Sequence, residues 1–260
     1  MSFLLDDAPY AATNDCQNIC AFLYLYKMIK NTICFFLVWL LVSCNPPTKS
    51  SSIKVVGQMS DVMWKGELKG NIATDSLEGA KAYGLGPLAF LKGEIVLFEG
   101  QTFVSKVIDS SSHKVSNVSS AKAPFFVYST ESDLKVVTIK QSKYSLKELE
   151  QHIDSIYKNY DQPLLLRIDG VFEELQLHTV NLPQDAQVSS PQQAHQGLTT
   201  YNFNSIKGSL IAFFSRHHKA VFTHHDSFLH AHFLSQDRHV LGHIDKLMFD
   251  SSKVSVKVSK

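Results

Sequence analysis

Short apolar runs separated by glycine-containing turns dominate the first half of the chain. The run at residues 53–58 is β-prone, and the apolar runs between residues 84 and 107 are interrupted at Gly93 and Gly100. This pattern is typical of hairpins, so it predicts a meander of antiparallel strands. Residues 74–83, which begin with residue types that cap helices, predict a short helix.

A serine and a glutamate three residues apart give the clearest helix signal. Ser145 and Glu148 form a capping box, in which each side chain satisfies a backbone amide of the other. The box predicts a helix that runs to about Tyr160, with its apolar residues on one face. The neighbouring segments are predicted as a serine-rich loop at residues 110–121 and two strands at residues 123–128 and 134–139.

Four further segments complete the pattern. The Asp169-Gly170 pair between two apolar runs predicts a hairpin turn. Residues 184–199, which contain glutamine, serine and proline, predict a loop that separates two sheet regions. Residues 206–214 predict a strand, and residues 253–259 predict an edge strand that its lysines protect.

These elements predict an α+β fold with mainly antiparallel or mixed β-sheets in two packed sheet regions and a few helices. We expect an N-terminal sheet and helix region at residues 53–183 and a C-terminal metal-binding sheet region at residues 200–260. A length of 260 residues with 44% hydrophobic residues suits such a globular protein. The formal net charge of +1 and the absence of a long basic run in the sequence argue against a nucleic-acid partner.

Histidines gather near the C-terminal end, where eight of the twelve lie between His217 and His243. His230 and His232 are two residues apart in a predicted strand, so their side chains share a face. Residues 235–238 predict a turn that folds the next strand back, with His243 opposite His230. All three imidazoles would then lie on one face of one hairpin.

Three imidazoles on one face predict a metal site. Imidazole is the commonest nitrogen ligand for zinc (Zn²⁺), and three protein ligands leave a coordination position open, as in catalytic zinc sites. The alternative is a histidine-rich strand with a solvated face, which His239 would share.

Glu94 begins an otherwise apolar strand, in which it alternates with Val96 and Phe98. If it faces inward with them, its carboxylate needs a partner or a metal. The alternative is a glutamate at the end of a strand that reaches solvent.

The N-terminal residues have the features of an export signal. All the cysteines, Cys16, Cys20, Cys34 and Cys44, lie in the first 44 residues, so the folded part has no disulfide and no cysteine ligand. An apolar run at residues 33–42 follows two lysines, and the sequence Leu-Val-Ser-Cys44 resembles a bacterial lipobox. We expect a lipoprotein signal peptide at residues 28–44, lipidated at Cys44. An uncleaved N-terminal membrane anchor is the alternative.

The other segments near the N-terminus follow from this prediction. Residues 1–27 are predicted to be a non-native extension, and residues 45–52 a flexible spacer. The protein is then expected to be exported and anchored to a membrane of the cell envelope, facing the periplasm.

Six stretches between residues 58 and 250 carry a resemblance to a known family: Gly84-Leu-Gly86, Leu91-Lys-Gly-Glu-Ile95, Pro124-Phe125, Arg167-Ile-Asp-Gly-Val-Phe172, Lys207-Gly-Ser-Leu-Ile-Ala-Phe213 and the segment from His230 to His243. Together they resemble the α-acetolactate decarboxylase family. The last stretch is the most specific, because the family's three zinc ligands have this order and spacing.

The resemblance implies a site and a reaction. It makes His230, His232 and His243 the zinc ligands and Glu94 an acidic group at the metal. The family removes CO₂ from 2-hydroxy-2-methyl-3-oxobutanoate to give acetoin, so the implied partner is a small 2-hydroxy-3-oxo acid. A metal with open positions suits this chemistry as a Lewis acid, and Glu94 could relay a proton. A homodimer is a further implied expectation.

The chain departs from the family pattern at two places. His178 stands where the family has an arginine that can engage the substrate carboxylate, and the chain has no glutamate after Glu174, where the family has another active-site glutamate. These departures favour an alternative function, a membrane-anchored lipoprotein of the same fold that binds a metal or a small ligand. A cupin-like metal enzyme ranks last, because no glutamate closely follows the His230–His232 pair.

Overall fold

The computed structural model describes residue 27 and residues 52–77, 81–130 and 133–259. The predicted extension, signal peptide, lipidation site at Cys44 and spacer lie outside these residues, except for Lys27 and Ser52. Among the described residues, no helix is both long enough and apolar enough to cross a membrane.

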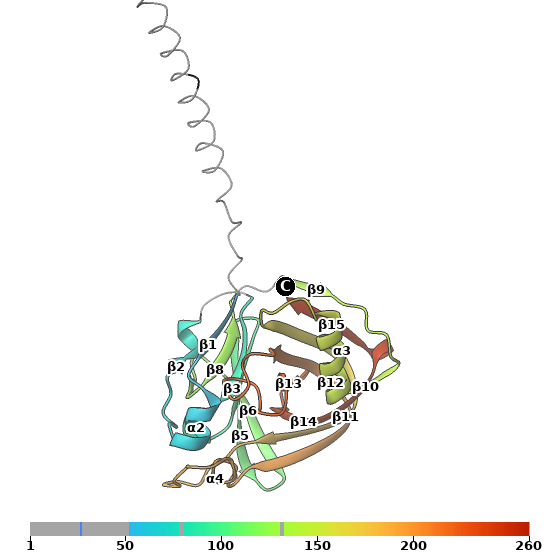
Figure 1. The fold of residues 1–260 in the computed structure, drawn as a ribbon. Helices are drawn as coiled ribbons and strands as arrows, with labels where there is room; N and C mark the ends of the chain where they lie inside the picture. Colours follow the sequence, from blue (N-terminus) through green and yellow to red (C-terminus); the bar gives the residue numbers. More distant parts are fainter. Residues whose placement is uncertain (1–26, 28–51, 78–80, 131–132, 260) are drawn as a thin grey trace, which may run out of the picture. The chain divides into compact units, whose positions relative to one another are not determined.

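Two antiparallel β-sheets form the body of the structure (Figure 1). The six-stranded sheet has the order β1-β8-β3-β4-β5-β6, and every pair of neighbours in it is antiparallel. Its strands are β1 (Ile53–Val56), β3 (Tyr83–Pro87), β4 (Glu94–Phe98), β5 (Gln101–Asp109), β6 (Ser112–Val118) and β8 (Phe126–Ser129).

The seven-stranded sheet has the order β10-β14-β13-β12-β11-β15-β9, with an additional β14–β11 pairing. Its strands are β9 (Leu134–Val136), β10 (Lys143–Ser145), β11 (Leu164–Thr179), β12 (Thr199–Phe214), β13 (Leu229–Ser235), β14 (Leu241–Asp250) and β15 (Val254–Ser259). The two longest strands, β11 and β12, lie at the centre of this sheet and pair along almost their whole length.

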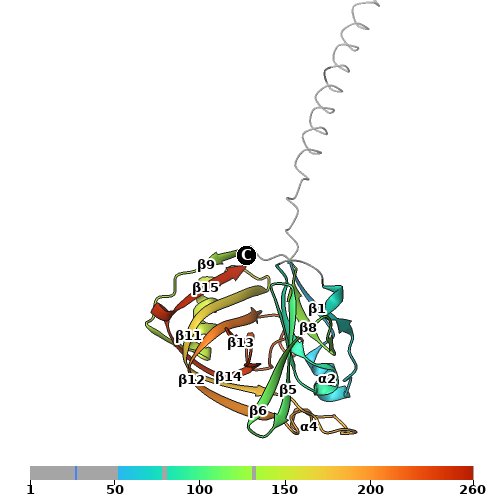
Figure 2. The same cartoon turned by 180° about the vertical axis from the view of Figure 1, so that it is seen from behind.

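The two sheets pack face to face, and both views show them lying against each other (Figures 1 and 2). A buried apolar cluster joins Val96 and Phe98 of the six-stranded sheet to Leu165, Phe213 and Leu241 of the seven-stranded sheet. Burial of these apolar side chains drives the packing. The predicted α+β fold with two packed sheet regions is confirmed.

Short helices and one small ladder complete the fold. The α-helices are α2 (Met59–Lys65), α3 (Leu146–Ile156) and α4 (Pro191–Ala194), and the 3₁₀ helices are Thr74–Ser76, Ala89–Leu91 and Ser251–Lys253. β2 (Ile72–Ala73) and β7 (Lys122–Ala123) pair with each other.

The predicted capping box opens α3. Glu148 donates its backbone N–H to the Ser145 hydroxyl, and the Glu148 carboxylate accepts from the Ser145 backbone N–H at 2.7 Å. Leu149 and Ile153 are buried in the cluster that lines the seven-stranded sheet. The helix ends at Ile156, four residues before the predicted end. Ile156 is exposed to solvent, so the apolar face of the helix is no longer packed against the sheet at this point.

Two predictions in the first half of the chain are wrong. The predicted loop at residues 110–121 contains β6, because its polar residues pair with β5 at the edge of the sheet, where solvent reaches them. The predicted helix at residues 74–83 is a single 3₁₀ turn, Thr74–Ser76, and Tyr83 already belongs to β3. The buried Thr74 hydroxyl accepts from Ala121 N–H and from Thr102, which holds this turn against its neighbours.

The predicted turn at Asp169-Gly170 is also wrong, because β11 runs through both residues. Gly170 lies opposite Gly208 of β12 and Val254 of β15. Its φ is 156°, and a Cβ atom there would lie 2.2 Å from the carbonyl oxygen of Lys253. The glycine is therefore needed because the neighbouring strand β15 lies too close for a side chain, and not because the chain turns here.

The uninterrupted β11 changes where the sheets divide. Strands on both sides of the loop at residues 184–199 belong to the seven-stranded sheet, so this loop does not separate the two sheets as predicted. β15 lies between β11 and β9 and is not the predicted edge strand, because β9 covers its outer side.

Gly170→Ala tests the close approach of β11 and β15. The added methyl group would overlap the Lys253 carbonyl, so we expect the free energy of unfolding to fall by about 2 kcal/mol or more. Urea denaturation measures this change. Gly100→Ala is the control, since Gly100 has a positive φ of 79° in an exposed turn and isolates the backbone contribution. Equal losses in the two variants would contradict the steric explanation.

Candidate metal centre

The hairpin of β13 and β14 carries the three predicted ligands. His232 lies opposite His243, whereas the sequence predicted that His230 would. The turn is centred one residue later than predicted, and Ser235 N–H closes it on the carbonyl of Val240. Because side chains alternate with a period of two, this shift leaves all three imidazoles on the predicted face.

The three imidazole rings lie together inside the protein. Ring centroids are 5.1 Å apart for His230 and His232, 5.0 Å for His230 and His243, and 5.5 Å for His232 and His243. The exposed fractions of these residues are 2%, 0% and 9%. The alternative of a solvated histidine face does not fit this burial.

Backbone carbonyls fix the orientation of two of these rings. His230 Nδ1 donates to the carbonyl of Phe222 at 2.6 Å, and His232 Nδ1 donates to the carbonyl of Ile95 at 3.1 Å. Since a carbonyl only accepts, Nδ1 of each ring carries the proton and Nε2 keeps its lone pair. This arrangement, with one nitrogen bound to the protein and the other free, is typical of histidines that ligate metals.

One of these lone pairs is buried without a partner. Among the described residues, three buried side-chain nitrogens have no hydrogen-bond partner, and two of them are His232 Nε2 and His243 Nδ1. A buried polar atom without a partner is costly, so the His232 lone pair indicates a missing electron acceptor. A divalent cation fits this position and this set of donors.

Glu94 faces inward at the start of β4, with an exposed fraction of 3%. One carboxyl oxygen accepts from the Val180 backbone N–H at 3.2 Å, and the other lies 3.8 Å from His232 Nε2. Burial raises the pKa of Glu94 well above its usual range, although the Val180 hydrogen bond acts in the opposite direction. The strand-end glutamate in solvent, the alternative from the sequence, does not match this position.

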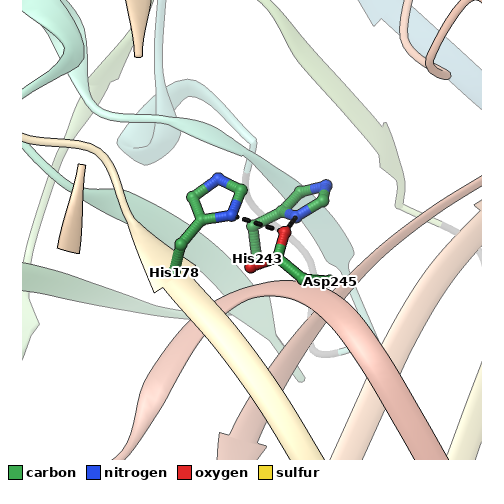
Figure 3. Close-up of side chains that lie close together, drawn as sticks. All are labelled: His178, His243 and Asp245. Atoms are coloured by element: carbon green, nitrogen blue, oxygen red, sulfur yellow. Dashed lines mark hydrogen bonds and ion pairs between the residues drawn. The ribbon is translucent and has the colours of Figure 1, made fainter. Parts of the chain in front are cut away.

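His178 joins the cluster from β11, where it lies opposite His243 (Figure 3). The two rings stack with centroids 4.6 Å apart, and His178 Nδ1 lies 2.7 Å from a carboxyl oxygen of Asp245. The same oxygen lies 3.7 Å from His243 Nδ1, which is close enough for attraction but too far for a hydrogen bond. His178, His243 and Asp245 thus offer ligand atoms within 4.8 Å of one another, and only His243 belongs to the predicted ligand set.

Sequence reasoning missed Asp245. Burial alone would raise its pKa, but the hydrogen bond from His178 and the nearby His243 hold that pKa far below its usual range. One signal could have found this residue. It follows His243 by two positions in a strand, so it shares the face of the predicted ligands.

Two further histidines border the cluster and were also missed. His224 Nε2 lies 3.0 Å from His243 Nε2, and the His195 ring lies 6.3 Å from the His178 ring. His224 comes from the loop between β12 and β13, and His195 follows α4. No periodicity in the sequence predicts which loop residues reach a site.

Burial sets the protonation of the ring cluster. It lowers the pKa of His230 and His232 well below the usual range, and the neighbouring imidazoles act in the same direction. Burial and the nearby His178 lower the pKa of His243 to about 3. All three rings are therefore neutral near pH 7, which is the form that binds metals.

A sequence model of the α-acetolactate decarboxylase family matches residues 56–260. The chain belongs to this family. It is 25% identical over 222 residues to the α-acetolactate decarboxylase of Brevibacillus brevis. The aligned region covers 83% of this chain and 72% of that protein. It is 24% identical over 211 residues to the α-acetolactate decarboxylase of Bacillus subtilis strain 168, and the aligned region covers 79% of this chain and 78% of the relative.

Solved structures show the fold of this family. The crystal structure of α-acetolactate decarboxylase from Bacillus subtilis strain 168 superposes with a TM-score of 0.68 at 22% identity, covering 80% of this chain and 84% of the other. A Staphylococcus aureus protein of unknown function, described as similar to α-acetolactate decarboxylase, gives 0.66 at 16% identity, with 80% and 84% covered. At these identities the likeness establishes a shared fold.

The buried neutral histidines make the stability of the metal-free protein depend on pH. Their folded-state pKa values are depressed, so below about pH 6.5 the unfolded chain binds protons that the folded protein does not. We therefore expect the free energy of unfolding to fall as the pH drops from 7.5 to 5.5.

Urea denaturation in the presence of a chelator measures this slope. His230→Gln should flatten it, whereas His239→Gln, at an exposed position on the same hairpin, should leave it unchanged. A slope that is the same in all three proteins would contradict the assignment to buried neutral imidazoles.

Proposed function

We propose that this family member catalyses the zinc-dependent decarboxylation of 2-acetolactate (2-hydroxy-2-methyl-3-oxobutanoate) to acetoin. The observation that carries the proposal is the buried, unpartnered lone pair of His232 Nε2, surrounded by two further imidazoles and the buried Glu94 carboxyl. Membership of the α-acetolactate decarboxylase family supports the choice of reaction.

His230, His232 and His243 would hold the zinc ion. When bound there, the ion would supply a Lewis acid that stabilises negative charge on the hydroxyl and ketone oxygens of the substrate. The protein's part is to keep these imidazoles neutral and oriented. Burial and the carbonyls of Phe222 and Ile95 do this.

The reaction breaks one carbon–carbon bond and needs one proton. When CO₂ leaves, the bonding electron pair stays on the substrate and is delocalised toward the adjacent ketone, and carbon then takes up a proton. Glu94 would supply it, because burial raises its pKa well above the usual range and so favours the protonated form. The Val180 N–H fixes one carboxyl oxygen and leaves the other directed toward His232.

His178, oriented by Asp245, would recognise the substrate carboxylate. The hydrogen bond between His178 Nδ1 and Asp245 orients the ring and leaves Nε2 as its other polar atom. We assign to His178 the task that the family pattern gives to an arginine.

Export of the protein is a further part of the proposal. The order of lysines, apolar run and Cys44 supports a lipoprotein that is anchored to a membrane of the cell envelope. In that location the catalytic domain would act on 2-hydroxy-3-oxo acids outside the cytoplasm.

An assay of the purified full-length protein with zinc tests the reaction. We expect acetoin to form from 2-acetolactate well above the spontaneous rate, and one zinc ion to be bound for each chain. His232→Ala should lose both the zinc and the activity, whereas His239→Ala should keep both. Full zinc content in His232→Ala would refute the site.

The same assay separates the two functions that the sequence leaves open. A protein that binds zinc stoichiometrically through His232 but forms no acetoin above the spontaneous rate would instead be a metal-binding or ligand-binding lipoprotein of this fold.

His178→Arg tests the recognition of the carboxylate. A guanidinium group offers two parallel donors to a carboxylate and can still pair with Asp245, so we expect kcat/KM for acetoin formation to stay equal or rise. His239→Arg adds the same charge at an exposed position and should leave kcat/KM unchanged. A collapse of activity in His178→Arg with zinc still bound would argue for a different substrate.

A further inference from the structure

His224 reaches the proposed metal centre from outside the strands that carry the other ligands. It lies in the loop at residues 215–228, between β12 and β13, and its side chain is half-buried. Its Nε2 atom lies 3.0 Å from His243 Nε2, and its ring centroid is 5.0 Å from that of His243 and 5.9 Å from that of His230.

We propose that His224 is a fourth imidazole ligand of the metal centre, and that it holds the coordination position that a substrate oxygen takes when it binds. This inference rests on the proposed function, because it assumes that His230, His232 and His243 bind the ion. It adds a residue to which neither the sequence pattern nor the family resemblance assigns a role.

The contact between the two Nε2 atoms carries the inference. The Asp245 carboxylate near His243 Nδ1 favours the tautomer with the proton on Nδ1, which leaves a lone pair on Nε2. Once His243 uses that lone pair for an ion, His224 can no longer donate a hydrogen bond to it. Two lone pairs 3.0 Å apart repel each other unless they share a cation.

The spacing of the rings suits one shared ion. Two nitrogens on a tetrahedral zinc ion lie about 3.3 Å apart, and their ring centroids about 5 Å apart, if each Zn–N bond is about 2.0–2.1 Å. Four ring pairs lie at 5.0–5.5 Å: His224–His243, His230–His243, His230–His232 and His232–His243. The His224–His230 pair is longer, at 5.9 Å, so the His224 ring would have to move slightly inward to share the ion.

His224 is the ligand that can leave, because its side chain comes from a loop and not from a paired strand. His230, His232 and His243 are fixed in paired strands. The loop backbone is anchored on both sides of His224, by the Met59 N–H at the carbonyl of Val221 and by the Glu150 carboxylate at the Phe228 N–H. A zinc ion with four protein ligands is closed. Rotation of the His224 side chain alone would open one position, while the loop backbone stays in place and its Phe222 carbonyl continues to orient His230.

X-ray absorption of the zinc-loaded full-length protein tests this proposal without an activity assay. The wild-type protein should show four imidazole nitrogens around zinc, and His224→Ala should show three, with zinc binding weakened about tenfold or more. Free imidazole added to His224→Ala should restore the fourth nitrogen. His225→Ala, at the exposed neighbouring position, should behave as wild type.

An unchanged imidazole count and zinc affinity in His224→Ala would overturn the proposal. If His224→Ala fails to fold, as judged by near-ultraviolet circular dichroism, His224→Gln retains most of the side-chain volume and gives the same readout.

His230→Ala separates this inference from the function on which it rests. If His230→Ala loses zinc while His224→Ala keeps normal zinc coordination, only the assignment of His224 as a ligand is refuted. Unchanged zinc binding in both variants would refute the whole metal centre.

Discussion

The site depends on one physical constraint, which is that each nitrogen of a buried imidazole needs a partner. The protein supplies one partner for each of three rings: a backbone carbonyl for His230 and for His232, and the Asp245 carboxylate for His178. These partners fix the tautomer and the orientation of each ring. The polypeptide provides no hydrogen-bond partner for the second nitrogen of His232, Nε2. The lone pair of this atom is therefore available to a divalent cation.

The seven-stranded sheet meets this constraint because three of its strands meet at one place. β14 pairs with β13 at His232–His243 and with β11 at His178–His243, so His243 has a histidine on each side. The register between these strands shifts next to His178, because Gln176 and Leu177 of β11 pair with Lys246 and Ile244 of β14, which leaves Asp245 as the extra residue in β14. The six-stranded sheet supplies the remaining wall, with Glu94 and the carbonyl of Ile95 at the start of β4.

The sequence contains the parts of the site that depend on periodicity. Alternation alone places His230, His232 and His243 on one face, and an error of two residues in register does not move them from it. Alternation also leaves Glu94 able to face inward. Asp245 satisfies the same rule, so it could have been predicted once His243 was.

The rest depends on packing between distant segments. Asp169-Gly170 has the composition of a hairpin turn, and only the neighbouring β15 shows that the glycine makes room for a strand. The pairing of His178 with His243 depends on β11 being continuous, so a sequence analysis that places a turn at Gly170 cannot predict it. β6 was missed for a related reason, because a polar edge strand has the composition of a loop and is defined by its partner, β5.

Charge balance offers a final argument about the centre. Neutral imidazoles give a divalent ion no compensating charge, so a buried site needs carboxylates close to its ligands. Glu94 lies 3.8 Å from His232 Nε2, and Asp245 lies 3.7 Å from His243 Nδ1. If both carboxyl groups were ionised, they would balance a charge of +2. With Glu94 protonated, the form that its burial favours, one excess positive charge remains, which suits the binding of an anionic substrate.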